Sequence, residues 1–113
     1  MAPDFTHMWP TDYHGAVALQ NRLRRRIVIQ PLTPGIRIVA GVDVSYDKHG
    51  SLMHAGVVVI RLPRFELLET TSASLPVTFP YVPGLLTFRE APAVLEAFAK
   101  LDARPQAVIV AAA

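Results

Sequence analysis

The sequence predicts a small α/β domain in which one helix, a three-stranded antiparallel meander, a second helix and a parallel strand follow one another. Three observations predict this order: a helical repeat of apolar residues near the N-terminus, an alternating apolar stretch after it, and a short continuous apolar run after a second helical repeat. The 113 residues suffice for one domain, and 51% apolar residues can form its hydrophobic core.

Residues 1–14 have no sustained period, so we expect an irregular, loosely attached lead-in to a single domain over residues 15–113. An amphipathic helix is predicted from Ala16 onward, where apolar residues recur at helical spacing: Leu19, Leu23 and Ile27. Its remaining surface carries the basic run Arg22–Arg26. A basic helix face is more often solvated than bound to phosphates, and both interpretations stay open.

The stretch from Ile36 to Tyr46 predicts the first strand, because its apolar side chains fall on every second residue. Residues 47–50 have the composition of a hairpin connection. Two further strands are expected, around His54–Leu62 and Glu66–Ala73. The short connections between these strands indicate an antiparallel meander.

A proline-rich loop over residues 76–84 separates the meander from a second helix, and its prolines favour an extended backbone. The helix is expected to carry Pro92 in its first turn, where proline is favoured. An apolar stripe follows: Val94, Leu95, Phe98 and Leu101. The run Ala107–Val110 predicts a buried strand that returns parallel to an earlier one after a helical crossover.

Composition excludes some classes of site. The sequence contains no cysteine, so disulfides and thiolate metal sites are excluded. We expect a cytoplasmic protein without a membrane anchor, because there is no secretion signal and no apolar run long enough to span a bilayer. The formal net charge of +2 is too small to indicate nucleic-acid binding by itself. The histidines have no spacing typical of a metal site: His7, His14, His49 and His54.

Asp43 is a carboxylate in the middle of the first predicted strand, with its side chain on the opposite face from the apolar ones. A charged group there must face solvent, pair with a cation or bind a metal, because burying it alone is too costly. For an isolated strand aspartate, solvent exposure is the commonest of these outcomes.

Three residues around the loop also stand out. Glu90 lies where the loop meets the second helix, so its carboxylate can either interact with the helix N-terminus or join an acidic site. Arg89 beside it is either a phosphate contact or a surface charge. Tyr81 has Pro80 and Pro83 on either side, which fix the backbone in advance. This arrangement favours display for stacking on bases, although packing in the core is the usual fate of a tyrosine.

Three motifs in order resemble the endonuclease V family: Gly41–Ser45, Phe79–Leu86 and Phe88–Glu90, with the meander between the first two. The likeness covers about residues 15–110. It implies a ribonuclease-H-like fold and a magnesium-dependent DNA-repair nuclease that cuts on the 3′ side of deoxyinosine and other deaminated bases.

The resemblance also implies roles for residues. Asp43 and Glu90 would be catalytic carboxylates that bind Mg²⁺, a metal that prefers hard oxygen ligands. Tyr81 would be a wedge that separates the damaged base from its neighbours. The rest of the nucleic-acid-binding segment would be Pro80, Pro83, Gly84 and Arg89. The implied partner is DNA containing deaminated bases, and inosine-containing RNA stays an alternative because no residue reads the 2′-hydroxyl by an obvious rule.

Ala111 stands where the family has a metal-binding aspartate in an Asp-Gly-His-Gly type motif. Because an alanine methyl cannot bind magnesium, we expect a truncated domain that is inactive alone. The terminal Ala-Ala-Ala is compatible with a truncated gene, a frameshift or a cloning scar. The alternative function is a non-catalytic nucleic-acid-binding or interaction module. A partly uncovered sheet edge and second helix would lead to marginal stability or self-association.

Overall fold

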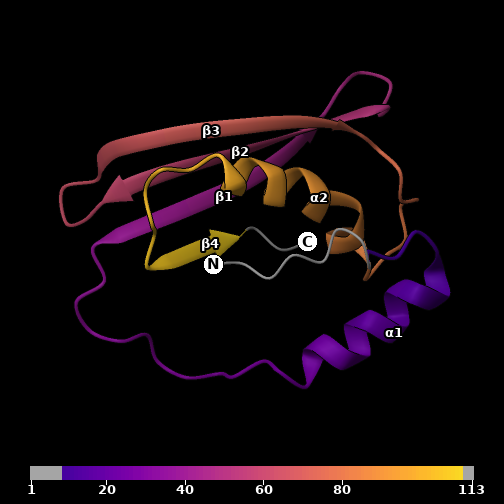
Figure 1. Ribbon diagram of the computed structural model, residues 1–113, viewed down its shortest axis with the longest axis horizontal. Helices are drawn as coiled ribbons and strands as arrows, with labels where there is room; N and C mark the ends of the chain where they lie inside the picture. Colours follow the sequence, from indigo (N-terminus) through magenta and orange to yellow (C-terminus); the bar gives the residue numbers. More distant parts are fainter. Residues whose placement is uncertain (1–8, 111–113) are drawn as a thin grey trace.

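The computed structural model describes residues 9–110, which form two helices and one four-stranded sheet (Figure 1). The elements are α1 Tyr13–Arg24, β1 Ile38–Tyr46, β2 Leu52–Arg61, β3 Glu66–Pro76, α2 Leu86–Ala99 and β4 Ala107–Val110. The strand order is β3-β2-β1-β4, with antiparallel β1–β2 and β2–β3 pairs and a parallel β1–β4 pair. The predicted order of elements and the predicted meander are confirmed.

The core lies between α2 and one face of the sheet. Alternate residues of β1 point toward α2, among them Ala40 and Val42, which pair with Val59 and Val57 of β2. Small side chains in the same cluster allow helix and sheet to approach closely: Ala55, Ala73, Ala93 and Ala97. Figure 1 shows α2 lying across this face. The odd-numbered residues of β1, including Asp43, therefore belong to the other face.

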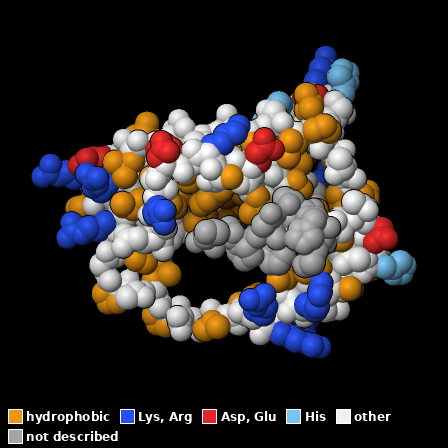
Figure 2. All heavy atoms as spheres, in the orientation of Figure 1, with side chains coloured by type: hydrophobic (Ala, Val, Ile, Leu, Met, Phe, Trp, Pro, Cys, Tyr) orange, Lys and Arg blue, Asp and Glu red, His pale blue; other side chains and the backbone are white. Residues whose placement is uncertain are grey.

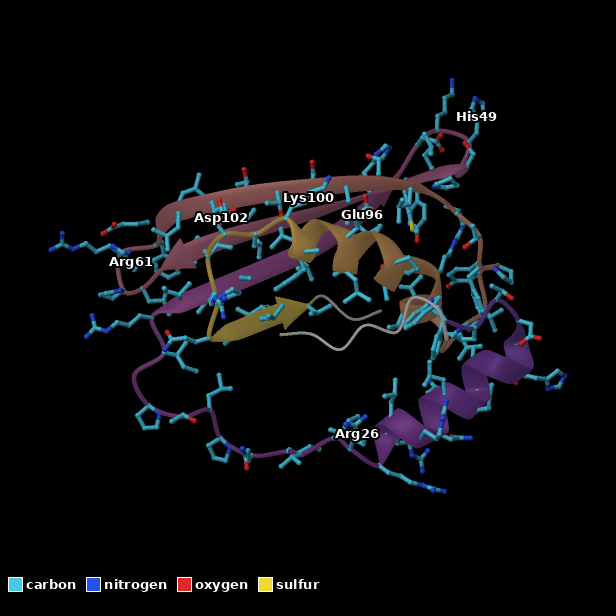
Figure 3. The ribbon with its side chains drawn as sticks, viewed as in Figure 1. Arg26, His49, Arg61, Glu96, Lys100 and Asp102 are labelled. Atoms are coloured by element: carbon cyan, nitrogen blue, oxygen red, sulfur yellow. The ribbon has the colours of Figure 1, made fainter. Side chains whose placement is uncertain are left out.

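The end of α2 is tied to β3 by hydrogen bonds. Lys100 Nζ donates to the Ser72 carbonyl at 2.7 Å. The Glu69 carboxylate accepts from the backbone N–H groups of Asp102 and Ala103, at 2.9 and 2.8 Å. Figure 3 labels Lys100 and Asp102 where the chain leaves α2. These contacts fix the direction in which the chain turns toward β4.

The helix α1 begins before the expected start and ends sooner than predicted. Asp12 is its N-cap and accepts from the Gly15 N–H at 2.7 Å, which satisfies a free donor of the first turn. The helix ends at Arg24, so the prediction that Ile27 belongs to the apolar stripe is wrong, and Ile27 is 67% exposed. A run of β-branched residues and then Pro31 disfavour continuation of the helix.

A proline inside α2 is compensated by a residue from the N-terminal lead-in. The prediction that Pro92 lies in the first turn is wrong, because α2 already begins at Leu86. Proline has no N–H to donate to the carbonyl of Phe88, four residues earlier. Trp9 Nε1 donates to that carbonyl at 2.9 Å instead, and the Trp9 and Phe88 ring centroids are 5.3 Å apart. The described end of the lead-in is thus attached to α2, contrary to the expected loose attachment.

A second apolar cluster joins α1 to the loop before α2, at the right-hand end of Figure 1. Its buried members are Ala16, Leu19, Phe79, Leu85 and Phe88. The helix α1 therefore packs on the loop and the start of α2 through its apolar side. This contact restrains the loop.

The strand β4 is an edge of the sheet, and its side chains are exposed within the part of the chain that the structure describes. Val108, Ile109 and Val110 are 45%, 67% and 62% exposed. The prediction that this run is a buried strand is therefore wrong for these residues, because nothing in the described part of the chain covers them. The predicted uncovered sheet edge is confirmed. Neither helix among residues 9–110 has the length and apolar character needed to cross a membrane.

Candidate nucleic-acid and metal site

The loop between β3 and α2 is built to a fixed shape. The Leu85 N–H donates to the Val82 carbonyl at 2.9 Å, closing a turn around Pro83 and Gly84. Gly84 has a φ of 84°, which favours glycine, and a proline before such a glycine is typical of a type II turn. From α1, Gln20 Nε2 donates to the Gly84 carbonyl at 3.0 Å. The loop backbone is therefore held both by its own turn and by α1.

Tyr81 is displayed by this loop. Its side chain is 67% exposed, whereas Phe79 is 2% exposed and Val82 packs against the second apolar cluster. Both Pro80 and Pro83 are exposed beside it. Of the two interpretations of Tyr81, display applies and core packing does not. The buried neighbours anchor the loop while the tyrosine ring faces outward.

Arg89 lies between two tyrosines. Its Cζ atom is 4.8 Å from the ring centroid of Tyr46, which is within the range of a cation–π contact. The same atom is 6.0 Å from the ring centroid of Tyr81, which is at the outer limit of that range. The side chain is half-buried, and its Nε atom is buried without a hydrogen-bond partner among the described residues. The interpretation of Arg89 as a plain surface charge is therefore wrong.

Glu90 is held by a hydrogen bond from β1. The first turn of α2 contains no acidic residue, so the interpretation of Glu90 as a ligand of the helix N-terminus is wrong. The Tyr46 hydroxyl donates to Glu90 Oε2 at 2.5 Å. Burial raises the pKa of Tyr46 to about 12, and the hydrogen bond and negative charge of Glu90 act in the same direction while Arg89 opposes them.

Asp43 lies on the sheet face away from α2 and is exposed. Its Oδ1 atom accepts from the N–H of the next residue, Val44, at 2.9 Å. Its neighbours on that face include Gly41 on the same strand and Gly56 directly opposite on β2. A Cβ atom added at either glycine would meet no atom within 4 Å. The surface around the Asp43 carboxylate is therefore open, and of the predicted outcomes solvent exposure applies in this structure.

The described residues do not fit a complete magnesium site. Asp43 belongs to the face of β1 away from α2, whereas Glu90 is in α2 and bonds Tyr46 on the near face. Within residues 9–110, no three His, Cys, Asp or Glu side chains are grouped closely enough to hold a metal ion. Ala111, where the resemblance places a third carboxylate, lies outside the described residues. Asp43 and Glu90 are hard oxygen donors, but the described residues do not bring such donors together in one metal site.

Comparison with known proteins assigns the family. The sequence pattern of endonuclease V matches residues 21–113. The endonuclease V of Roseiflexus sp. (strain RS-1) is 44% identical over 109 residues, which cover 96% of this chain and 48% of that protein. The chain belongs to the endonuclease V family. The crystal structure of endonuclease V from Streptomyces avermitilis matches with a TM-score of 0.83 and 36% identity, covering 90% of this chain and 46% of that one.

The predicted endonuclease V membership and ribonuclease-H-like α/β fold are confirmed by these matches. Endonuclease V from Ciona intestinalis has the same fold, with a TM-score of 0.75 at 23% identity over 86% of this chain and 44% of that one. That protein was crystallised with a 23mer DNA containing an inosine followed by a ribo-adenosine. The chain spans about half the length of the curated endonuclease V relatives it matches.

Tyr46 is the residue of this endonuclease V family member that sequence reasoning missed. It ends the alternating pattern of β1 on the side facing α2 and pairs with Met53, which is 1% exposed. A tyrosine at such a position places its hydroxyl near apolar core residues, where it requires a hydrogen-bond partner. The sequence pattern indicates that the Tyr46 hydroxyl needs a partner, but it does not indicate that this partner is Glu90.

Basic side chains gather over the end of α1 in Figure 2, where the last turn carries Arg22 and Arg24. Figure 3 places Arg26 just beyond this end. Cations at a helix C-terminus interact favourably with the helix dipole even when they are solvated. The position of these arginines therefore needs no phosphate partner to explain it. Phosphate binding by this part of the endonuclease V fold stays a prediction.

Three of the four histidines fall within the described residues. His54 Nδ1 lies 2.7 Å from Ser74 Oγ. His14 is exposed on α1, and Figure 3 shows His49 at the tip of the β1–β2 hairpin. His7 lies outside the described residues.

Proposed function

We propose that this chain supplies the base-recognition part of a magnesium-dependent endonuclease that cuts DNA on the 3′ side of deoxyinosine and other deaminated bases. The observation that carries the proposal is Tyr81, exposed on a loop whose backbone is fixed by its own turn and by α1. The membership of this chain in the endonuclease V family supports the class of reaction, cleavage of a nucleic-acid strand. The inosine-containing DNA bound by the Ciona intestinalis protein supports the partner.

Tyr81 and Arg89 have complementary parts in this function. An exposed aromatic ring can stack on a base or enter the space between two bases. Arg89, whose guanidinium lies beside that ring, would neutralise a nearby phosphate. Because the loop is ordered before DNA arrives, little conformational entropy is lost on binding.

Asp43 and Glu90 are the residues that this chain would contribute to a magnesium site. When bound, Mg²⁺ supplies an activated water and stabilises negative charge on the scissile phosphate. The described residues place the two carboxylates on different sides of β1. Cleavage therefore requires groups beyond the described residues, and no step of cleavage is assigned to this chain alone.

A non-catalytic module that binds nucleic acid is the second candidate. One observation favours it: the displayed loop is braced entirely by residues of this chain, whereas the two carboxylates are not joined. Such a module would bind inosine-containing DNA through Tyr81 without cutting it.

A cleavage assay separates the two candidates. Labelled DNA with one inosine is incubated with this chain, and with a hybrid that carries Ala111→Asp and continues with the second half of the Roseiflexus endonuclease V. We expect the hybrid, but not the original chain, to cut the DNA in the presence of magnesium. Asp43→Asn in the hybrid should abolish this cutting. Binding of the DNA by the original chain without cutting would then assign it the module's role. A hybrid that folds but leaves inosine DNA uncut would contradict the nuclease proposal.

A further inference from the structure

Tyr46 connects the sheet to two neighbouring residues of α2, Arg89 and Glu90. It is the last residue of β1, half-buried, and its ring and hydroxyl contact different partners. The hydroxyl donates to Glu90 Oε2, and the ring lies under the guanidinium of Arg89. A residue in a paired strand is a firmer base than a residue in the loop itself.

The hydrogen bond to Glu90 fixes the tyrosine ring. A ring held only through packing can turn about its side-chain torsions, but a 2.5 Å contact to a carboxylate holds its hydroxyl in one place. Glu90 is next to Arg89 in the same helix, so the tether and the stacking partner share one rigid element. The ring of Tyr46 is therefore held at a set distance from Arg89.

Arg89 in turn lies against Tyr81. Its Cζ atom is 4.8 Å from the Tyr46 centroid and 6.0 Å from the Tyr81 centroid, so one planar cation contacts both rings. The buried Nε atom has no hydrogen-bond partner among the described residues, which leaves the ring faces as observed partners of the guanidinium. The chain of contacts runs from the strand through Arg89 to the exposed Tyr81.

We propose that Tyr46 is a positioning residue for DNA binding, whose tethered ring supports Arg89 against Tyr81 and so holds the exposed tyrosine in its binding orientation. The inference rests on the proposed function, because it assumes that Tyr81 contacts DNA. It assigns Tyr46 no contact with DNA and no part in bond cleavage. Its effect on binding is transmitted through Arg89.

Fluorescence anisotropy on the full 113-residue chain tests this role. Affinity is measured without divalent metal for single strands with and without one inosine, and the ratio of the two dissociation constants defines the preference. Tyr46→Leu removes ring and tether, and we expect it to lower the preference about two- to fivefold, the range of one exposed cation–π contact. Tyr46→Phe keeps the ring and should lower it less. Tyr13→Leu, at an exposed tyrosine of α1, is the matched control and should change nothing.

The outcomes separate this inference from the function on which it rests. A wild-type preference that is unchanged in Tyr46→Leu overturns the role of Tyr46 and leaves the proposed function standing. Absence of any preference in the wild-type chain overturns both. If circular dichroism shows that Tyr46→Leu does not fold, Arg89→Lys is tested instead. An ammonium group does not stack on an aromatic ring as a guanidinium does. A loss of the same size then supports the stacked arrangement, and an unchanged preference overturns it.

Discussion

The hydrogen bond from Trp9 to the carbonyl of Phe88 can be isolated by a double-mutant cycle. Trp9→Phe removes the donor but keeps an aromatic ring against Phe88. A hydrogen bond of this kind contributes about 1 kcal/mol to the free energy of unfolding. The smaller ring loses apolar contact worth about 1 kcal/mol more at about 25 cal/mol per Å². We therefore expect Trp9→Phe to destabilise the chain by about 2 kcal/mol.

Pro92→Ala provides the second arm of the cycle. The substitution restores a backbone N–H that can donate to the same Phe88 carbonyl within the helix. In that background the carbonyl no longer depends on the indole, so Trp9→Phe should cost about 1 kcal/mol less than in the wild-type chain. The difference between the two costs measures the hydrogen bond without the change in ring size.

Urea unfolding followed by circular dichroism gives both costs. Tryptophan fluorescence cannot be used, because Trp9 is the single tryptophan of the chain. Tyr13→Phe, at an exposed site, is the control and should stay within about 0.5 kcal/mol of the wild type. Equal costs of Trp9→Phe with and without Pro92 would refute the claim that the indole replaces the donor that proline lacks.

Three further perturbations follow from single residues. Hydrogen bonds from the backbone of residues 102 and 103 lower the pKa of Glu69, so its stabilising effect is present above its ordinary pKa of 4.5 and is lost as the pH falls through the lowered value. Unfolding measured against pH should show a shallower acid loss for Glu69→Gln than for the wild type. Tyr46 has the opposite pH dependence, because its pKa is raised from 10.0 to about 12. Its stabilising effect is present below pH 10 and is lost as the pH rises toward 12, so the free energy of unfolding of Tyr46→Phe should fall less over this range. Gly84→Ala forces an L side chain to a φ of 84° and should lower the free energy of unfolding by about 1 kcal/mol, whereas an unchanged melting temperature would contradict the turn.

The order of elements was predictable because it depends on local patterns. The alternating residues of β1 predicted the strand, and placed Asp43 opposite to Val42, because the side-chain period of a strand is two. An apolar run after a helix predicted that β4 runs parallel to an earlier strand, and the structure pairs it with β1 in this direction. Local sequence was sufficient for both conclusions.

The start of α2 was not predictable from local sequence. Pro92 is typical of a first helical turn, but here it lies inside the helix because Trp9, from the other end of the chain, satisfies the carbonyl that proline leaves free. The same limitation applies to Glu90, whose partner Tyr46 belongs to a distant strand. Contacts of this kind depend on the assembled fold, and no periodicity encodes them.

The display of Tyr81 was predictable, but the local shape of its loop and the support of the loop were not. The prolines predicted a rigid, extended loop with Tyr81 displayed, and the structure has Tyr81 exposed beside a turn at Gly84 that was not predicted. The bracing contact from Gln20 of α1 and the stack on Arg89 join segments far apart in the sequence. Whether Asp43 and Glu90 bind a metal stays a prediction.

Recognition of a deaminated base through Tyr81 is the function that we propose for this chain. The direct measurement is the ratio of dissociation constants for undamaged and inosine-containing strands, compared between the wild type and Tyr81→Ala, with Tyr13→Ala as the exposed control on α1. Because one base–aromatic stack contributes about 1–3 kcal/mol, we expect Tyr81→Ala to weaken binding to the inosine strand at least about fivefold and to remove the preference, while Tyr13→Ala changes neither. An inosine preference that survives Tyr81→Ala in a folded protein would contradict the claim.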